Sequence, residues 1–196
     1  MKYVMALHLL IFKKGTNMPT FILTPNGDQI QEWDSSGGGT SSYTDVDNDN
    51  GDTEYAFSNT GNERLIVDMT DPSVASGDVD TIDSVTIKAS AAKTLTGLSQ
   101  MYFKQIGTAA DSSLISNGID TITVAAGGSY STYSGTTETT SDGTNAWVYG
   151  DLTGLQLRIT KFRNDRFGEL RISYLYAEVA YTAAVTDNAT FFGTNF

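Results

Sequence analysis

Residues 170–182 read LRISYLYAEVAYT and are rich in β-branched and aromatic side chains, as long β-strands are. The even-numbered residues are apolar in the first half, and the apolar set then moves to the odd-numbered residues. Because side chains alternate between the two faces of a strand, this change predicts a strand buried on both faces or a bulge near Ser173. We expect this strand to lie inside a β-sandwich rather than at its edge.

The rest of the chain also reads as short strands joined by turns. The clearest alternation falls in residues 78–93, where Val85, Ile87, Ala89 and Ala91 share one face. Further strand-like runs are residues 20–24, 30–33, 53–58, 65–69, 98–106, 119–125 and 155–159, with a turn expected at 25–28 and one helical turn at 151–154. Without an amphipathic helix, this pattern predicts an all-β fold: a single antiparallel, jelly-roll-like β-sandwich over residues 19–182, with arms at 1–18 and 183–196.

Composition narrows the classes of function. The chain has 196 residues, enough for one domain with a substantial core. Twelve Lys and Arg against 23 Asp and Glu give a net charge of -11, which repels phosphate backbones and anionic lipid, so we expect no direct nucleic-acid or membrane binding. Cysteine is absent, which excludes disulfides, thiolate chemistry and Cys-ligated zinc.

The two ends are apolar. Residues 1–17, MKYVMALHLLIFKKGTN, make a poor signal peptide and are too short to span a bilayer, so they are either an upstream translation start ahead of Met18 or an ordered arm. The tail places Phe191, Phe192 and Phe196 where termini tend to be polar. We expect both ends to reach adjacent subunits; the alternative is that they fold back over an exposed sheet edge.

Catalytic residues are scarce. His8, inside the apolar N-terminal run, is the only histidine that could activate a nucleophile or bind zinc. Glycoside hydrolysis needs only two carboxylates, but their pairing cannot be seen in a sequence. We therefore expect no enzymatic activity and no cofactor beyond a candidate Ca²⁺.

The candidate Ca²⁺ site is an acidic loop. Asp45, Asp47, Asp49 and Asp52 place hard oxygen ligands at close spacing, although the glycine and the twelfth position depart from an EF-hand. The alternatives are a solvated loop and a loop that touches a basic surface on a neighbour.

Two further groups of residues suggest binding surfaces. A sugar-stacking platform could be formed by Trp33, Trp147, Tyr130, Tyr133 and Tyr149, although such residues are more often part of a core. A basic span contains Arg158, Lys161, Arg163, Arg166 and Arg171, with Phe162 and Phe167 beside it. A basic span of this kind, facing an acidic flank, predicts contacts between identical subunits or with a neighbour. The alternative is a solvated loop.

Several blocks occur in a familiar order: FILTPNGDQIQEW, DTEYAF, GDVDTIDSVTIKASAA, GDLTGLQLRIT and RISYLYAEVAYT. Together they resemble a group of β-sandwich structural proteins of tailed bacteriophages, with Tyr176, Glu178, Val179 and Tyr181 carrying the match in the last strand. The resemblance implies a virion component, commonly a head decoration or minor capsid protein, whose partners are copies of itself and other virion subunits. The alternatives are a subunit of an extracellular β-filament and a carbohydrate-binding module.

Overall fold

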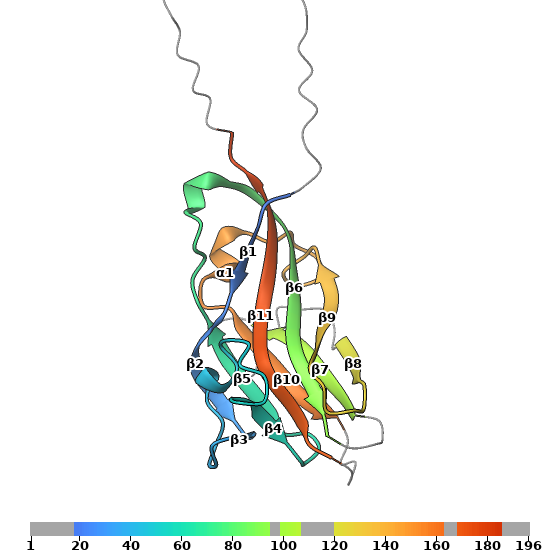
Figure 1. Ribbon diagram of the computed structural model, residues 1–196. Helices are drawn as coiled ribbons and strands as arrows, with labels where there is room; N and C mark the ends of the chain where they lie inside the picture. The colour runs from blue at the N-terminus through green and yellow to red at the C-terminus, as the bar shows by residue number, and fades with distance from the viewer. Residues whose placement is uncertain (1–17, 95–98, 107–119, 163–167, 186–196) are drawn as a thin grey trace, which may run out of the picture.

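The computed structural model describes residues 18–94, 99–106, 120–162 and 168–185. Strand β11 (Leu170–Ala183) lies in the middle of a sheet and pairs along one flank with β6 (Val79–Lys93). On its other flank, β4 (Ala56–Ser58) pairs with the start of β11 and β1 (Thr20–Leu23) pairs with its second half (Figure 1). The prediction that residues 170–182 form a strand inside the fold is confirmed.

The predicted bulge in β11 is also present. The register with β6 shifts between Ile172 and Tyr174, so that Ser173 is the extra residue, and Ser173 is fully buried. Before the shift Leu170 and Ile172 belong to the core, and after it the odd-numbered residues do. The move of the apolar residues from even to odd positions in the sequence therefore corresponds to this shift in the pairing of β11 with β6.

Strand β6 has the face predicted from its alternation. Val85, Ile87, Ala89 and Ala91 all belong to the core. Thr86 and Ser90 on the other face are nevertheless almost fully buried, at 9% and 6% exposed, because β6 lies between β11 and the edge strand β9 (Ser131–Glu138).

The described residues form two antiparallel sheets. The first has the order β3-β4-β11-β6-β9, with β1 also paired to β11, and the second has the order β2-β5-β10-β7-β8. The remaining strands are β2 (Pro25–Gln31), β3 (Asp34–Ser35), β5 (Arg64–Met69), β7 (Ser99–Ile106), β8 (Asp120–Val124) and β10 (Gln156–Phe162). Three short helical segments complete the described chain: η1 (Tyr43–Asp45), η2 (Ser76–Asp78) and α1 (Tyr149–Leu152).

One core lies between the two sheets. It joins Val179 and Ile87 of the first sheet to Val67 and Leu157 of the second, and the ribbons of the two sheets lie one behind the other (Figure 1). The absence of long helices and the antiparallel pairing confirm the predicted all-β class for the described part of the chain.

The strand order links segments that are distant in sequence. Eight of the strands, β1 and β5 to β11, can be numbered one to eight in chain order, leaving out β2, β3 and β4. In these numbers the first sheet contains the neighbouring strands one, eight, three and six. The second sheet contains the neighbouring strands two, seven, four and five. Consecutive strands lie in opposite sheets except for strands four and five, which are neighbours in the second sheet, and this is the arrangement of a jelly roll built from two Greek keys. The finer description as a jelly-roll-like sandwich stays an interpretation, and this order supports it.

The expectation for residues 25–33 needs correction. Pro25 to Asp28 were expected to form a turn ahead of a strand at 30–33, but β2 already begins at Pro25. Its register with β5 shifts between Pro25 and Gly27 and again between Asp28 and Ile30. Proline and these irregularities are tolerated because β2 is an edge strand, which needs ladder hydrogen bonds on one side only.

Candidate functional site

The acidic segment 45–52 lies against the flank of β11 that β4 and β1 leave uncovered. Val46 accepts a hydrogen bond from the Leu175 backbone N–H at 2.9 Å, and Asp47 forms an isolated bridge with Tyr174. Val46 is fully buried in the common core. The segment therefore extends the sheet between β4 and β1, and it is held by backbone pairing as well as by its carboxylates.

Asp45 acts as a local structural anchor. Its carboxylate accepts hydrogen bonds from the Ser35 hydroxyl at 2.9 Å and from the Ser42 backbone N–H at 2.8 Å. The second bond completes the capping box of η1. Asp45 is 7% exposed, so both bonds compensate for the removal of its charge from water.

The other predicted Ca²⁺ ligands have separate partners. Asp47 accepts from the Asn48 side chain, Asp49 accepts from the Ser173 hydroxyl at 3.1 Å, and Asp52 lies 3.4 Å from Arg171. Within the described ranges, no group of three His, Cys, Asp or Glu side chains is placed to hold a metal ion. The structure does not bring the four carboxylates into one cluster, and Ca²⁺ binding stays a prediction.

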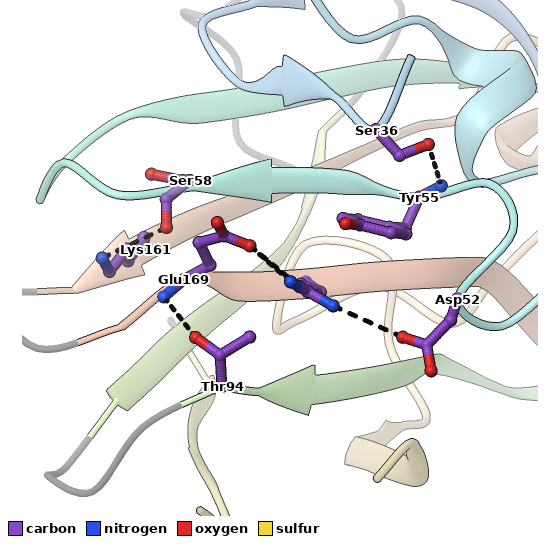
Figure 2. Close-up of polar contacts among 8 residues, drawn as sticks. Ser36, Asp52, Tyr55, Ser58, Thr94, Lys161 and Glu169 are labelled. Atoms are coloured by element: carbon purple, nitrogen blue, oxygen red, sulfur yellow. Dashed lines mark hydrogen bonds and ion pairs between the residues drawn. The ribbon is translucent and has the colours of Figure 1, made fainter. Parts of the chain in front are cut away.

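Arg171 is the centre of a network at the start of β11. Its Nε donates to Glu169 at 2.9 Å, and its guanidinium lies 4.6 Å from the centre of the Tyr55 ring. Partial burial alone would lower the pKa of Arg171, but the hydrogen bond to Glu169 and the charge of Glu169 raise that pKa above its ordinary value. Figure 2 shows Tyr55, Asp52 and Glu169 gathered on this side of the sheet.

Tyr130 lies close to the same network. Burial, followed by the nearby charge of Asp52, raises the pKa of Tyr130. Its hydroxyl is buried and has no hydrogen-bond partner among the residues that the structure describes. Asp52 and Arg171 were both singled out in the sequence, but their contact within one chain was not predicted, because the members of the network are spread from Asp52 to Arg171.

A stacked pair of tyrosines follows along β11. The Tyr174 and Tyr176 rings lie 4.7 Å apart with 27° between their planes, on the face opposite the core residues Leu175 and Ala177. Burial, then the neighbouring Tyr176 and the charges of Asp49 and Asp47, raises the pKa of Tyr174. The acidic segment and the pair Tyr174 and Tyr176 therefore form one continuous surface.

The basic span is not one patch. Arg158 of β10 and Arg171 of β11 alternate with core residues of different sheets, so they lie on opposite outer faces. Lys161 is fully buried, and its Nζ donates to the Ser58 carbonyl at 3.2 Å (Figure 2). Phe162 ends β10, and the remaining predicted interface residues lie outside the described residues: Arg163, Arg166, Phe167, Phe191, Phe192 and Phe196.

The two tryptophans belong to the core, which was the alternative to a sugar-stacking platform. Trp33 is fully buried and donates to the Glu63 carbonyl at 3.0 Å, while Trp147 is 3% exposed and donates to the Glu138 carbonyl at 3.1 Å. Tyr149 is tied to the Val74 carbonyl at 2.6 Å. Neither indole has a free face for a sugar, because both belong to the core.

One open depression adjoins the acidic segment. It has a volume of about 360 Å³ and is lined by Ser35, Ser36, Gly37, Asp45, Thr53 and Glu54. Five of its six lining residues carry polar side chains, and its most buried carboxylate, Asp45, is already engaged by Ser35 and Ser42.

Comparisons with protein families, with curated proteins and with solved structures found no match to this chain. Over the described ranges, the structure contains no helix long and apolar enough to cross a bilayer.

Proposed function

We propose that the chain is a non-enzymatic structural subunit of a virus particle, most specifically a head decoration or minor capsid protein of a tailed phage that joins neighbouring subunits. The strand order of the two sheets carries this proposal, since jelly-roll domains are widespread in viral capsids. A fold hosts many functions, so the assignment needs a direct test of where the protein occurs.

The positions of the resembling blocks support the proposal. GDVDTIDSVTIKASAA falls in η2 and β6, and RISYLYAEVAYT falls in β11. These two strands pair with each other from Leu170 opposite Lys93 to Ala183 opposite Val79. These two of the five resembling blocks therefore build the centre of the first sheet.

The described ends of the chain also suit a tethered subunit. Tyr181 of β11 donates a hydrogen bond to the Pro19 carbonyl at 3.1 Å, so the first and last described residues leave at the same end of the molecule (Figure 1). Contacts made by both predicted arms would start from this end, and many copies on a symmetric particle would add avidity.

Two observations test the proposed role. Genes for terminase, portal and tail proteins beside the coding sequence, and the protein itself in mass spectra of purified particles, are the expected results. Secretion genes beside it, with the protein in an extracellular filament fraction, would instead establish the filament alternative and overturn the virion assignment.

A further inference from the structure

Asp47 and Asp49 carry charges that no described cation balances. Among the described residues, Asp47 accepts only from Asn48 and its neighbour Asp49 only from the Ser173 hydroxyl, both neutral donors. Asp49 is exposed and Asp47 is half-buried, so both can meet a partner. Burial is the main reason that the pKa of Tyr174 is raised, and the charges of Asp49 and Asp47 raise it further.

The cations on this face of the sheet are already engaged. Lys88 lies 2.8 Å from Glu178, and Arg171 lies 2.9 Å from Glu169 and 3.4 Å from Asp52. Pairing of each cation with a carboxylate leaves the surface beside the tyrosine pair net negative. A partner that covers it must bring positive charge.

The same face shows which cation suits it. The Arg171 guanidinium stacks on the Tyr55 ring at 4.6 Å and is flanked by the carboxylates of Asp52 and Glu169. Tyr174 and Tyr176 offer tyrosine rings beside the carboxylates of Asp47 and Asp49. Lys88 lies opposite Tyr176 in the pairing of β6 with β11, but its ammonium is already paired with Glu178. A planar guanidinium fits this arrangement better than a compact, strongly hydrated ammonium, because it can stack on a ring and donate to two carboxylate oxygens together.

We propose that the surface formed by Asp47, Asp49, Tyr174 and Tyr176 binds an arginine side chain in a segment of a partner protein. This inference rests on the proposed role as a subunit that joins neighbours, and it names the chemistry of the neighbour. The arginine would stack on the tyrosine pair and donate to the two aspartates. Charge complementarity selects this partner over a neutral peptide, and ring stacking selects arginine over lysine.

Calorimetric titration of the full chain with short oligo-arginine and oligo-lysine peptides tests the proposal. We expect tighter binding of oligo-arginine, with affinity about two- to fivefold weaker in Tyr176→Ala and retained in Tyr176→Phe. The double variant Asp47→Asn with Asp49→Asn should bind oligo-arginine about two- to tenfold more weakly, since each exposed ion pair contributes little alone.

The matched control removes two exposed carboxylates elsewhere, by Asp71→Asn with Asp80→Asn, and should leave the affinity nearly unchanged. Equal losses in both double variants, or equal binding of the two peptides, would mean non-specific attraction to an acidic protein and would overturn the proposal. Ca²⁺ binding that disappears in the Asp47→Asn, Asp49→Asn variant and displaces oligo-arginine would make the surface a metal site and would also overturn it.

Circular dichroism of each variant shows that it is folded before binding is compared. The outcomes are separable from those of the virion test. Specific peptide binding by a protein missing from particles would remove the virion role alone, and presence in particles without specific peptide binding would remove the arginine site alone.

Discussion

Lys161 illustrates how far a single residue could be interpreted from the sequence. Its basic neighbours in the sequence suggested that Lys161 belongs to a charged surface. Its spacing from Leu157 and Ile159, however, places it on the core side of the strand. The structure follows the alternation, and Lys161 and Lys93 are both fully buried. Strand parity was the stronger signal, because one buried face fixes the register of every side chain along a strand.

Replacement of Lys161 by alanine should destabilise the fold. The change removes a buried four-carbon stem and the donor to the Ser58 carbonyl, for which we expect a loss of about 2–4 kcal/mol in urea unfolding. Asp71→Ala, at an exposed position, serves as the control and should change the free energy of unfolding by less than about 0.5 kcal/mol. Equal effects of the two changes would contradict the burial of Lys161.

The ion pair of Glu32 with Arg64 predicts a pH dependence. The hydrogen bond from the Arg64 side chain holds the pKa of Glu32 below its ordinary value of 4.5. A lowered pKa in the folded state means that the stabilisation is complete above pH 4.5 and is lost as the pH falls through the folded pKa. We expect Glu32→Gln to lower the thermal midpoint slightly at neutral pH and not in strong acid; the pair is partly exposed, so the effect is small.

At the scale of elements, β6 and β11 were predictable because long alternating runs identify a buried face. The bulge was predictable for the same reason, since parity can change only where a residue is inserted. Strand β2 was not, because Pro25 and Gly27 are ordinary turn residues and only its place at an edge explains their presence in a strand. The position of the acidic segment beside β11 was not predictable either, because the segment is attached mainly through backbone groups of Val46 and Asp47.

Deletion of Ser173 should abolish folding. Without the extra residue, either the first or the second half of β11 must turn its core side chains to solvent. Ser173→Ala keeps the bulge and should cost only about 1 kcal/mol for the lost hydrogen bond to Asp49. A deletion variant that unfolds cooperatively with a native-like midpoint would refute this explanation of the parity change.

Asp120 should protect an edge of the first sheet. Its carboxylate accepts from the Thr136 backbone N–H and hydroxyl, both at 2.6 Å, and so occupies a donor on the edge strand β9. Asp120→Ala exposes that donor to pairing with another chain. We expect larger species in light scattering as concentration rises, which should be absent for Asp71→Ala.

At the scale of the whole molecule, the single core and the all-β class followed from pattern and composition, whereas the pairing of distant strands did not. Alternation tells which face of a strand is buried, but it does not name the partner strand. The candidate surface likewise joins residues from 47 to 176, and no local pattern places them together.

Removal of residues 186–196 tests the predicted C-terminal arm. A cut after Val185 leaves β11 and the bond from Ala184 N–H to the Asp78 carbonyl in place, so the thermal midpoint of the isolated monomer should not change. If these residues reach adjacent subunits, attachment to particles should fall. Retained assembly with a midpoint lowered by several degrees would show that the tail covers its own sheet instead.

The central place of β11 has a consequence for the time course of biosynthesis. A ribosome completes β6 long before it makes the strand that pairs with it from Lys93 opposite Leu170 onward. During that interval the first sheet has a gap at its centre, and the backbone N–H and C=O groups along that flank of β6 have no partner strand. The pairing joins segments far apart in the chain, which slows folding and lengthens the exposure to aggregation, so the nascent protein should depend on chaperones until the last strand is released.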